Sequence, residues 1–327
     1  MSGQDPLRKS RLGLRGLLLV SGAVLVGSSI FLLDNSEVFD GSTPTTSLSG
    51  PLTTAPSATS GVTGATGATP NGQGQQTAGP ALVPVYWLGD VNGTDKLFRE
   101  FRTPLNGSTA DPIADAVRTM TRETPLDPDY RTPWEPASAV SSSVSTKNVI
   151  TLDISADAFP ARLDADEADL ALQQLVYTAT AAAANAGLIA GGESSSVVVL
   201  VDGAADYRAF NAVDLTGERT RDTSSLAPVW IIDPQDGITT GSVVNIRGVG
   251  PSTEESLDWR IDGITPEDTS GATESTDTPV RDGSVPITPE DGVPGAYSFT
   301  VSLPPGHYRI TLATDDGAGD TKTVHVE

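Results

Sequence analysis

Histidine is the residue type that most often serves as a catalytic base or a metal ligand in proteins. The two present, His307 and His325, fall in alternating apolar runs near the end of the chain, and there is no cysteine anywhere. We expect no zinc site, because such sites are built mainly from cysteine and histidine, and the chain offers two histidines alone. His307 is also the sole candidate base for a serine nucleophile, and no Gly-x-Ser-x-Gly turn occurs in the folded part. A hydrolase triad is therefore not expected.

Acidic residues gather in two places. The cluster Asp164 to Asp169 surrounds the start of a predicted helix, where the helix dipole favours negative charge. The run Asp315 to Asp320 offers carboxylates of the kind that bind Ca²⁺, although a hairpin turn explains it without metal. A glycosidase-like carboxylate pair stays open, since acidic residues are numerous and nothing selects two of them. No Walker or dinucleotide glycine pattern occurs. The sequence thus predicts no catalytic residue, no metal site and no cofactor.

Tryptophans could form a platform for sugar rings. Trp87, Trp230 and Trp259 lie inside apolar runs that read as strands, so we expect them in the core. Trp134 lies in an irregular segment between Pro133 and Pro136. Trp134 is therefore the candidate among the four for an exposed binding edge, since aromatic residues are enriched at interfaces, and burial in the core is the alternative.

The start of the chain predicts a membrane anchor. An uncharged, mostly apolar run covers residues 16–33, and its eighteen residues span roughly 27 Å as a helix, close to the ~30 Å hydrocarbon core. Four basic residues precede it: Arg8, Lys9, Arg11 and Arg15. We predict a cytoplasmic tail at 1–15, a transmembrane helix at 16–33 and an extracytoplasmic remainder. A cleaved signal peptide and a buried helix are the alternatives.

Charge and composition exclude several classes of partner and of chemistry. The formal net charge is −22 at pH 7, and such a field repels nucleic acid and anionic headgroups. The lack of cysteine excludes disulfides, thiol catalysis and a lipid-modified cysteine anchor. Residues 34–81 are dominated by Gly, Ser, Thr, Ala and Pro, which predicts a disordered linker.

Residues 82–216 are predicted to form an α+β domain that opens with a hairpin. Asn92-Gly93 separates two apolar runs and suits a tight turn. Asp111 followed by proline predicts the start of a helix that extends to Arg122. On that helix Ile113, Val117 and Met120 share one face.

A longer helix is predicted over residues 165–186, capped by Asp164 and ended by Gly187. Its alanine-rich stripe should pack on a sheet, whereas Asp169, Gln173 and Thr180 should face solvent or a partner. Strands are predicted at 149–154 and 196–201, and the second should be buried on both faces.

Helical periodicity disappears after a predicted linker at 217–227. Short alternating runs separated by turns predict an all-β sandwich over 228–327. The runs are Val229 to Ile232, Val243 to Ile246, Leu257 to Ile261, Tyr297 to Val301, His307 to Leu312 and Thr323 to Val326. The polar stretch Glu267 to Asp282 is predicted to be a long mobile loop.

The order of elements over residues 82–203 resembles the GerMN domain of sporulation and spore-germination proteins. The matching features are Val85-Tyr86-Trp87, the return strand Arg99 to Arg102, the helix Asp111 to Arg122, the strand end Leu152-Asp153-Ile154-Ser155 and the closing Val199-Leu200-Val201-Asp202-Gly203. Residues 228–327 resemble the immunoglobulin-like domain that often follows GerMN. The cues there are Ile232-Asp233-Pro234, Val244 to Gly248, Trp259-Arg260-Ile261 and Tyr297 to Val301. The resemblance implies a GerMN-like α/β sandwich followed by an immunoglobulin-like sandwich, in an exported envelope protein without an established reaction.

We therefore expect a membrane-tethered binding or assembly protein of the bacterial cell envelope, and not an enzyme. It should be a single-pass protein of the cell membrane with a cytoplasmic N-terminus. The expected partners are envelope proteins or further copies of the chain through the GerMN-like domain, cell-wall polymer, and the lipid bilayer through residues 16–33. No nucleic-acid partner is expected. The alternative is an enzyme that acts on cell-wall polymer through a carboxylate pair.

Overall fold

The computed structural model describes residues 82–327, except 106, 160–161, 190–193, 252, 266–276 and 291–292. The predicted basic flank, membrane helix at 16–33 and linker at 34–81 lie outside the described residues. Within the part of the chain that is described, no helix is both long and apolar enough to cross a membrane.

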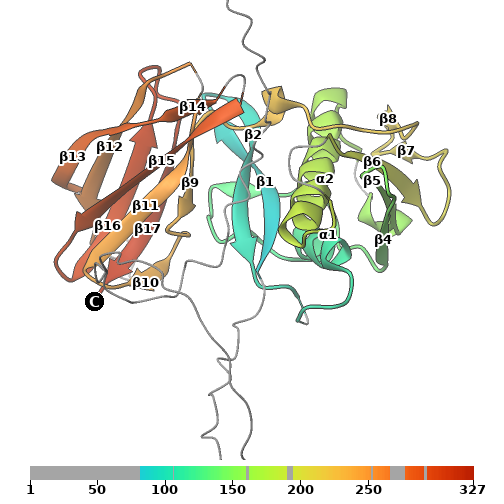
Figure 1. The fold of residues 1–327 in the computed structure, drawn as a ribbon, viewed down its shortest axis with the longest axis horizontal. Coiled ribbons are helices and arrows are strands. Elements are labelled where there is room, and N and C mark those ends of the chain that lie inside the picture. Colours follow the sequence, from blue (N-terminus) through green and yellow to red (C-terminus); the bar gives the residue numbers. More distant parts are fainter. Residues whose placement is uncertain are drawn as a thin grey trace, which may run out of the picture.

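The first domain places two helices between two small sheets (Figure 1). One sheet has the order β2-β1-β3 and the other β4-β5-β6. The helices are α1 (Pro112–Arg122) and α2 (Ala165–Asn185), with a 3-10 turn at Ala156–Ala158. The strands are β1 (Val83–Val91), β2 (Thr94–Arg102), β3 (Tyr130–Arg131), β4 (Val140–Val144), β5 (Val149–Ile154), β6 (Ser196–Val201), β7 (Arg208–Ala209) and β8 (Val213–Asp214).

The opening hairpin and the first helix confirm the sequence prediction. Asn92 and Gly93 both adopt positive φ, 53° and 82°, as the two central residues of a type I′ turn must. The Asp111 side chain accepts a hydrogen bond from the Ala114 amide at 2.9 Å and so caps α1. Ile113, Val117 and Met120 are fully buried beneath it, as their spacing predicted.

Helix α2 begins and ends as predicted, but its predicted solvent face is wrong in part. Asp164 accepts from the Glu167 amide at 2.8 Å, and Gly187 follows the helix at a φ of 67°. Thr180, expected to face solvent, is 0% exposed, and its hydroxyl accepts from Arg221 Nε at 2.8 Å. The reason is the segment after β8, which lies along this face of the helix: Gln173 Nε2 donates to the Thr220 carbonyl at 3.1 Å, and Arg221 covers Thr180.

Strand β6 corrects a second expectation. It pairs in parallel with β5 at the end of the β4-β5-β6 sheet, and on its other side the described residues contribute a bridge between Val197 and Arg219. Val197 and Val199 face the core, whereas Val198 and Leu200 are half-buried. The continuous apolar run therefore marks an edge strand and not a strand buried on both faces.

The second domain is the predicted β-sandwich. Its sheets have the orders β10-β17-β16-β12-β13 and β14-β15-β11-β9. A 3-10 turn at Thr223–Ser225 precedes it. The strands are β9 (Trp230–Asp233), β10 (Ile238–Thr240), β11 (Val243–Gly250), β12 (Ser256–Gly263), β13 (Thr278–Pro286), β14 (Thr288–Glu290), β15 (Val293–Ser302), β16 (Gly306–Ala313) and β17 (Gly319–Val326). The loop predicted for Glu267 to Asp282 is wrong at its end, because residues 278–282 belong to β13; residues 267–276 lie outside the described residues.

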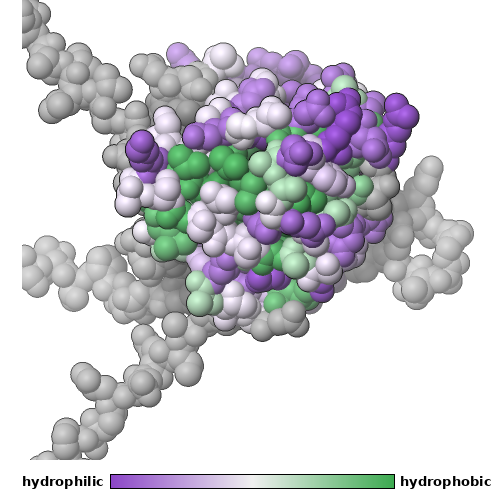
Figure 2. Space-filling view, turned by 90° about the vertical axis from the view of Figure 1, so that its right-hand side faces the viewer, coloured by the Kyte–Doolittle hydropathy of each residue, from purple (hydrophilic) through white to green (hydrophobic). Residues whose placement is uncertain are grey.

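Strand β9 and the residue before it, Val229, contribute to two cores at once. Val229 and Ile231 pack inside the sandwich, whereas Trp230 and Ile232 belong to the core of the first domain. The segment 217–227, predicted to be a linker, also packs on the first domain: the Ala227 amide donates to the Leu97 carbonyl at 3.0 Å. Two domains are therefore joined by an extensive contact (Figure 1). On the side of the molecule formed by the first domain, hydrophobic residues gather across the middle and hydrophilic residues toward the upper right (Figure 2).

Candidate functional site

Trp134, the candidate for an exposed binding edge, is buried instead. Its side chain is 4% exposed, and its ring meets those of Phe159 and Phe210 edge-on at 4.8 and 4.9 Å between centroids. The proline-flanked backbone is irregular, as the sequence indicates, but it passes over an aromatic cluster of the core. An irregular segment therefore did not imply an exposed side chain. Trp87 and Trp230 are buried as predicted, and Trp259 is half-buried against Phe299.

The two histidines meet across neighbouring strands. His307 on β16 and His325 on β17 are partners in register, with rings stacked 4.2 Å apart. Glu327 lies 3.8 Å from His325. The described part of the chain contains no group of three or more His, Cys, Asp or Glu placed to hold a metal ion. The pair therefore reads as a cross-strand contact of the sheet.

The acidic run between β16 and β17 forms the predicted hairpin turn. Asp316 accepts hydrogen bonds from the Thr314 hydroxyl and, at 3.2 Å, from the Ala318 amide, which closes the turn. Asp320 points elsewhere, into the contact between the domains. The carboxylates of this run therefore do not converge on one point.

The acidic cluster at the start of α2 is engaged in capping and ion pairs. Asp164 caps the helix, and Glu167 lies 2.8 Å from Arg131. Asp95 from β2 pairs with the same guanidinium, and Asp169 lies 4.0 Å from Arg219. These partners explain the cluster as a charged surface around a helix N-terminus.

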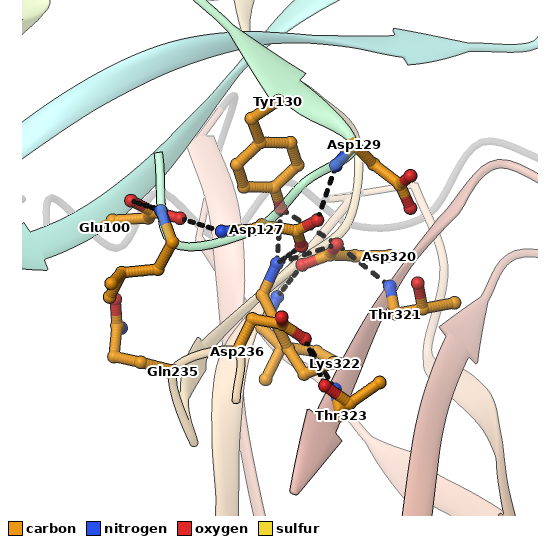
Figure 3. A network of polar contacts seen from close by, with 12 residues as sticks. Glu100, Asp127, Asp129, Tyr130, Gln235, Asp236, Asp320, Thr321, Lys322 and Thr323 are labelled. Carbon is orange, nitrogen blue, oxygen red and sulfur yellow. Dashed lines mark hydrogen bonds and ion pairs between the residues drawn. The ribbon is translucent and has the colours of Figure 1, made fainter. Parts of the chain in front are cut away.

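A buried ionic cluster joins the two domains (Figure 3). Lys322 on β17 is 2% exposed, and its Nζ donates to Asp127 at 2.5 Å, to the Tyr130 hydroxyl at 2.6 Å and to Asp320 at 3.1 Å. Asp127 and Tyr130 come from the first domain, whereas Asp320 and Lys322 come from the second. We call Glu100, Asp127, Tyr130, Asp320 and Lys322 the ionic cluster.

The remaining polar atoms of the ionic cluster are also satisfied. Glu100 accepts from the amides of Leu126 and Asp127 at 3.0 and 2.9 Å, which fixes the loop that carries Asp127. Asp320 accepts from the Tyr130 hydroxyl at 2.8 Å and from the Ile231 amide at 2.7 Å. A buried charge network stabilises only when its members are paired in this way.

Burial and charge set the protonation of the ionic cluster. Burial alone would lower the pKa of Lys322, but Asp320 and Asp127 outweigh it and raise that pKa above its usual value. Burial raises the pKa of Glu100 and of Asp320. Burial also raises the pKa of the Tyr130 hydroxyl, so this group keeps its proton. Lys322 is therefore a cation held between the domains.

Beside the ionic cluster the same interdomain contact opens into a pocket of about 690 Å³. Three arginines line it: Arg99 from β2, Arg221 from the segment after β8, and Arg247 from β11. No carboxylate occurs among the described residues that line it. We call it the arginine pocket. Its wall also contains Tyr86, Tyr177, Leu226, Trp230, Ile232, Val249, Pro294 and Tyr297.

Four residues that line the arginine pocket each have a buried polar atom without a hydrogen-bond partner among the described residues. These atoms are Arg99 Nε, Tyr177 Oη, Trp230 Nε1 and Arg247 Nε. Asp233 lies 3.4 Å from Arg247 Nε, an ion-pair distance, but the two do not form a hydrogen bond. Such unpaired buried groups are rare in native proteins and call for an explanation.

Local structure places these side chains. Arg99 and Glu100 are neighbours on β2, so alternation sends Glu100 into the ionic cluster and Arg99 into the pocket. The register between β11 and β9 shifts between Arg247 and Gly248, so the pairing of the two strands is irregular where they form the pocket wall. At Gly248 a Cβ atom would lie 2.2 Å from the Trp230 carbonyl oxygen and 2.3 Å from the Tyr297 hydroxyl, so glycine is required.

Sequence reasoning missed both halves of this interdomain site. Its residues come from positions as far apart as Arg99 and Lys322, and no local pattern links them. One signal was available: the run Val229 to Ile232 is apolar at four successive positions, which indicates a strand buried on both faces. That reading would have predicted a domain packed against β9.

Comparison with known proteins confirms the resemblance of the first domain. Residues 84–206 match the family described as Germane, sporulation and spore germination. No curated protein matches the chain.

Solved structures with some likeness include a sporulation protein and a β-glucosidase. The tandem GerMN domains of the sporulation protein GerM from Bacillus subtilis are 16% identical, with a TM-score of 0.32, over 43% of this chain and 45% of that one. A β-glucosidase from Listeria innocua in complex with gluconolactone is 12% identical, with a TM-score of 0.18, over 27% and 14%. Its complex with isofagomine is also 12% identical, with a TM-score of 0.17, over 38% and 19%. The chain thus spans less than half the length of these proteins.

Proposed function

We propose that this chain is a membrane-tethered binding and assembly protein of the bacterial cell envelope, linked to sporulation, germination or envelope assembly. One observation carries the proposal: the arginine pocket is built from both domains, and the ionic cluster beside it fixes them against each other. A pocket of about 690 Å³ has the size of known ligand sites. The two domains then act as a single binding body.

The start of the sequence supports the tether. The apolar run at 16–33 behind four basic residues suits a single membrane span with a cytoplasmic N-terminus. A flexible linker over 34–81 would have an r.m.s. span of roughly 40 Å, enough to hold the folded part away from the bilayer. The folded domains would then meet partners in the extracytoplasmic space.

The family of the first domain supports the biological setting. Residues 84–206 match a family described by sporulation and spore germination, and we propose envelope proteins or further copies of the chain as its partners. The helix α2, once a candidate contact surface, is covered within the domain and is not proposed as the interface.

Protease accessibility tests the topology. Protease added to wall-stripped intact cells should digest the folded domains and spare a cytoplasmic tag placed before Met1. A cytosolic protein serves as the control for cell integrity. Protection of the domains until detergent is added would contradict the tether.

Crosslinking tests the binding role. In intact cells, the full chain should form a discrete crosslinked species in the membrane fraction. The same species should decrease when Arg99 and Arg247 are both replaced by Gln, and it should persist in Arg208→Gln, whose arginine lies on the surface. A pattern that does not depend on the pocket arginines would contradict a binding role for this site.

A further inference from the structure

We propose that the arginine pocket binds a small organic anion: a carboxylate or phosphate group attached to an apolar or ring-shaped body. This inference deepens the proposed function and rests on it for the view that the pocket serves binding. The chemistry of the pocket wall selects the ligand class in three steps.

The first step is charge. Arg99, Arg221 and Arg247 line the pocket, and the described lining contributes no carboxylate. The chain as a whole has a formal net charge of −22, so this concentration of cations runs against its composition. Asp233 offsets part of the charge of Arg247 from 3.4 Å, which leaves an excess of positive charge in the pocket. Arginine also presents paired N–H groups that match the oxygens of carboxylate and phosphate.

The second step is hydrogen bonding. The unpartnered atoms Arg99 Nε, Arg247 Nε and Trp230 Nε1 are donors and cannot accept, and the Tyr177 hydroxyl can donate as well. Burial raises the pKa of Tyr177, so its hydroxyl keeps the proton that it would donate. A group of buried donors without acceptors is complementary to a ligand rich in lone pairs. Carboxylate and phosphate oxygens supply those lone pairs together with the opposite charge.

The third step is the remainder of the wall. The rings of Tyr86, Tyr177 and Trp230 and the side chains of Leu226 and Val249 give an apolar surface on either side of the domain contact. The guanidinium of Arg221 lies over the Tyr177 ring at 4.9 Å, which holds this cation at the pocket wall. An inorganic ion would leave these apolar surfaces exposed to water, whereas an anion with an apolar body would bury them.

The test is calorimetric titration of the full chain in neutral detergent with four probes at neutral pH: phenyl phosphate, phenylacetate, inorganic phosphate and phenol. Phenyl phosphate or phenylacetate should bind saturably. Inorganic phosphate and phenol should each bind at least about tenfold more weakly, because each lacks one half of the chemistry. The comparison of phenyl phosphate with phenylacetate identifies which anionic group the pocket prefers.

Variants assign the binding to the pocket. Arg99→Gln and Arg247→Gln should each weaken the better probe by about tenfold or more. Arg208→Gln, a surface arginine outside the pocket, should leave affinity unchanged. Where a Gln variant loses its native melting temperature, Arg99→Lys and Tyr177→Phe replace it, and an intermediate loss of affinity is then expected from each.

Three results would overturn the inference: no saturable binding of either anionic probe, equal affinity for phenol, or equal affinity in the native chain and the folded pocket variants. Any of them would mean that the arginine pocket is not a selective site for an organic anion. The proposed function would stand separately, because the dependence of the cellular crosslinks on the same arginines is measured without any of these probes.

Discussion

The interdomain contact has two halves that differ in how their charged groups are paired. In the ionic cluster the cation Lys322 is buried and paired with Asp127 and Asp320. In the arginine pocket the cations Arg99 and Arg247 are half-buried, and their Nε atoms have no hydrogen-bond partner among the described residues. The halves are adjacent in the chain as well as in space, since Glu100 belongs to one and Arg99 to the other.

The difference assigns a structural role to the ionic cluster and a binding role to the arginine pocket. A fully paired buried cluster resists opening, because removal of any member leaves a buried charge without a partner. A group of unpaired polar atoms is stabilised when a ligand forms hydrogen bonds with it. One half therefore fixes the two domains in place, and the other half presents groups that remain to be paired.

The largest effect is expected from Lys322→Met. This change leaves Asp127 and Asp320 buried without their cation and should lower the free energy of unfolding by about 3–5 kcal/mol. Denaturant unfolding of the full chain measures it. Arg208→Gln removes an ion pair between exposed side chains and should cost no more than about 1 kcal/mol. A cost for Lys322→Met as small as that of Arg208→Gln would erase the distinction between the halves.

A smaller effect is expected from Gly248→Ala at the wall of the arginine pocket. The added methyl group would overlap the Trp230 carbonyl and the Tyr297 hydroxyl, and the strands must shift to accept it. Overpacking of this kind costs about 1–3 kcal/mol. Gly241→Ala, where a Cβ meets nothing within 4 Å, is the matched control. Equal melting temperatures for the two variants would show that the strands adapt freely.

Alkaline pH should weaken the ionic cluster through Lys322. Its pKa is raised in the folded state, so its contribution to stability is complete below the unfolded pKa, about 10.4, and is lost as pH rises through the higher folded value. The native chain should therefore lose more stability than Lys322→Met as the pH rises above about 10. Denaturant midpoints of the two proteins, measured at each pH, give the comparison. Parallel curves for the two proteins would exclude a proton linked to Lys322.

The smallest effect on stability is expected from Arg99→Gln. Arg99 makes no ion pair among the described residues, and its guanidinium lies 5.3 Å from the centre of the Phe101 ring. Loss of that contact should cost no more than about 1 kcal/mol. Thermal unfolding measures it. A loss of stability as large as that of Lys322→Met would mean that Arg99 stabilises the contact between the domains and is not reserved for ligand binding.

Local patterns predicted the elements of both domains well. The Asn92-Gly93 turn, the Asp111 and Asp164 caps and the alternation of the sandwich strands each depend on residues close in sequence. Local chemistry sets such features, so one sequence suffices to predict them. The family resemblance of the first domain was predictable for the same reason.

Exposure and site geometry were not predictable in this way. Trp134 and Thr180 looked accessible, yet an aromatic cluster covers the first and Arg221 covers the second. Both outcomes depend on segments that are distant in sequence. The interdomain site was not predicted for the same reason. The sequence shows which residues are charged, but not which distant residues come into contact.

The central claim is that the ionic cluster fixes the two domains, and hydrogen exchange at Ile231 tests it most directly. The Ile231 amide donates to Asp320 at 2.7 Å, so it reports opening of this half of the contact. Exchange of the peptide that carries it should accelerate about 100-fold or more in Lys322→Met, whereas strand β5, inside the first domain, should keep most of its protection. Equal exchange at Ile231 in the native chain and in Lys322→Met would contradict the claim.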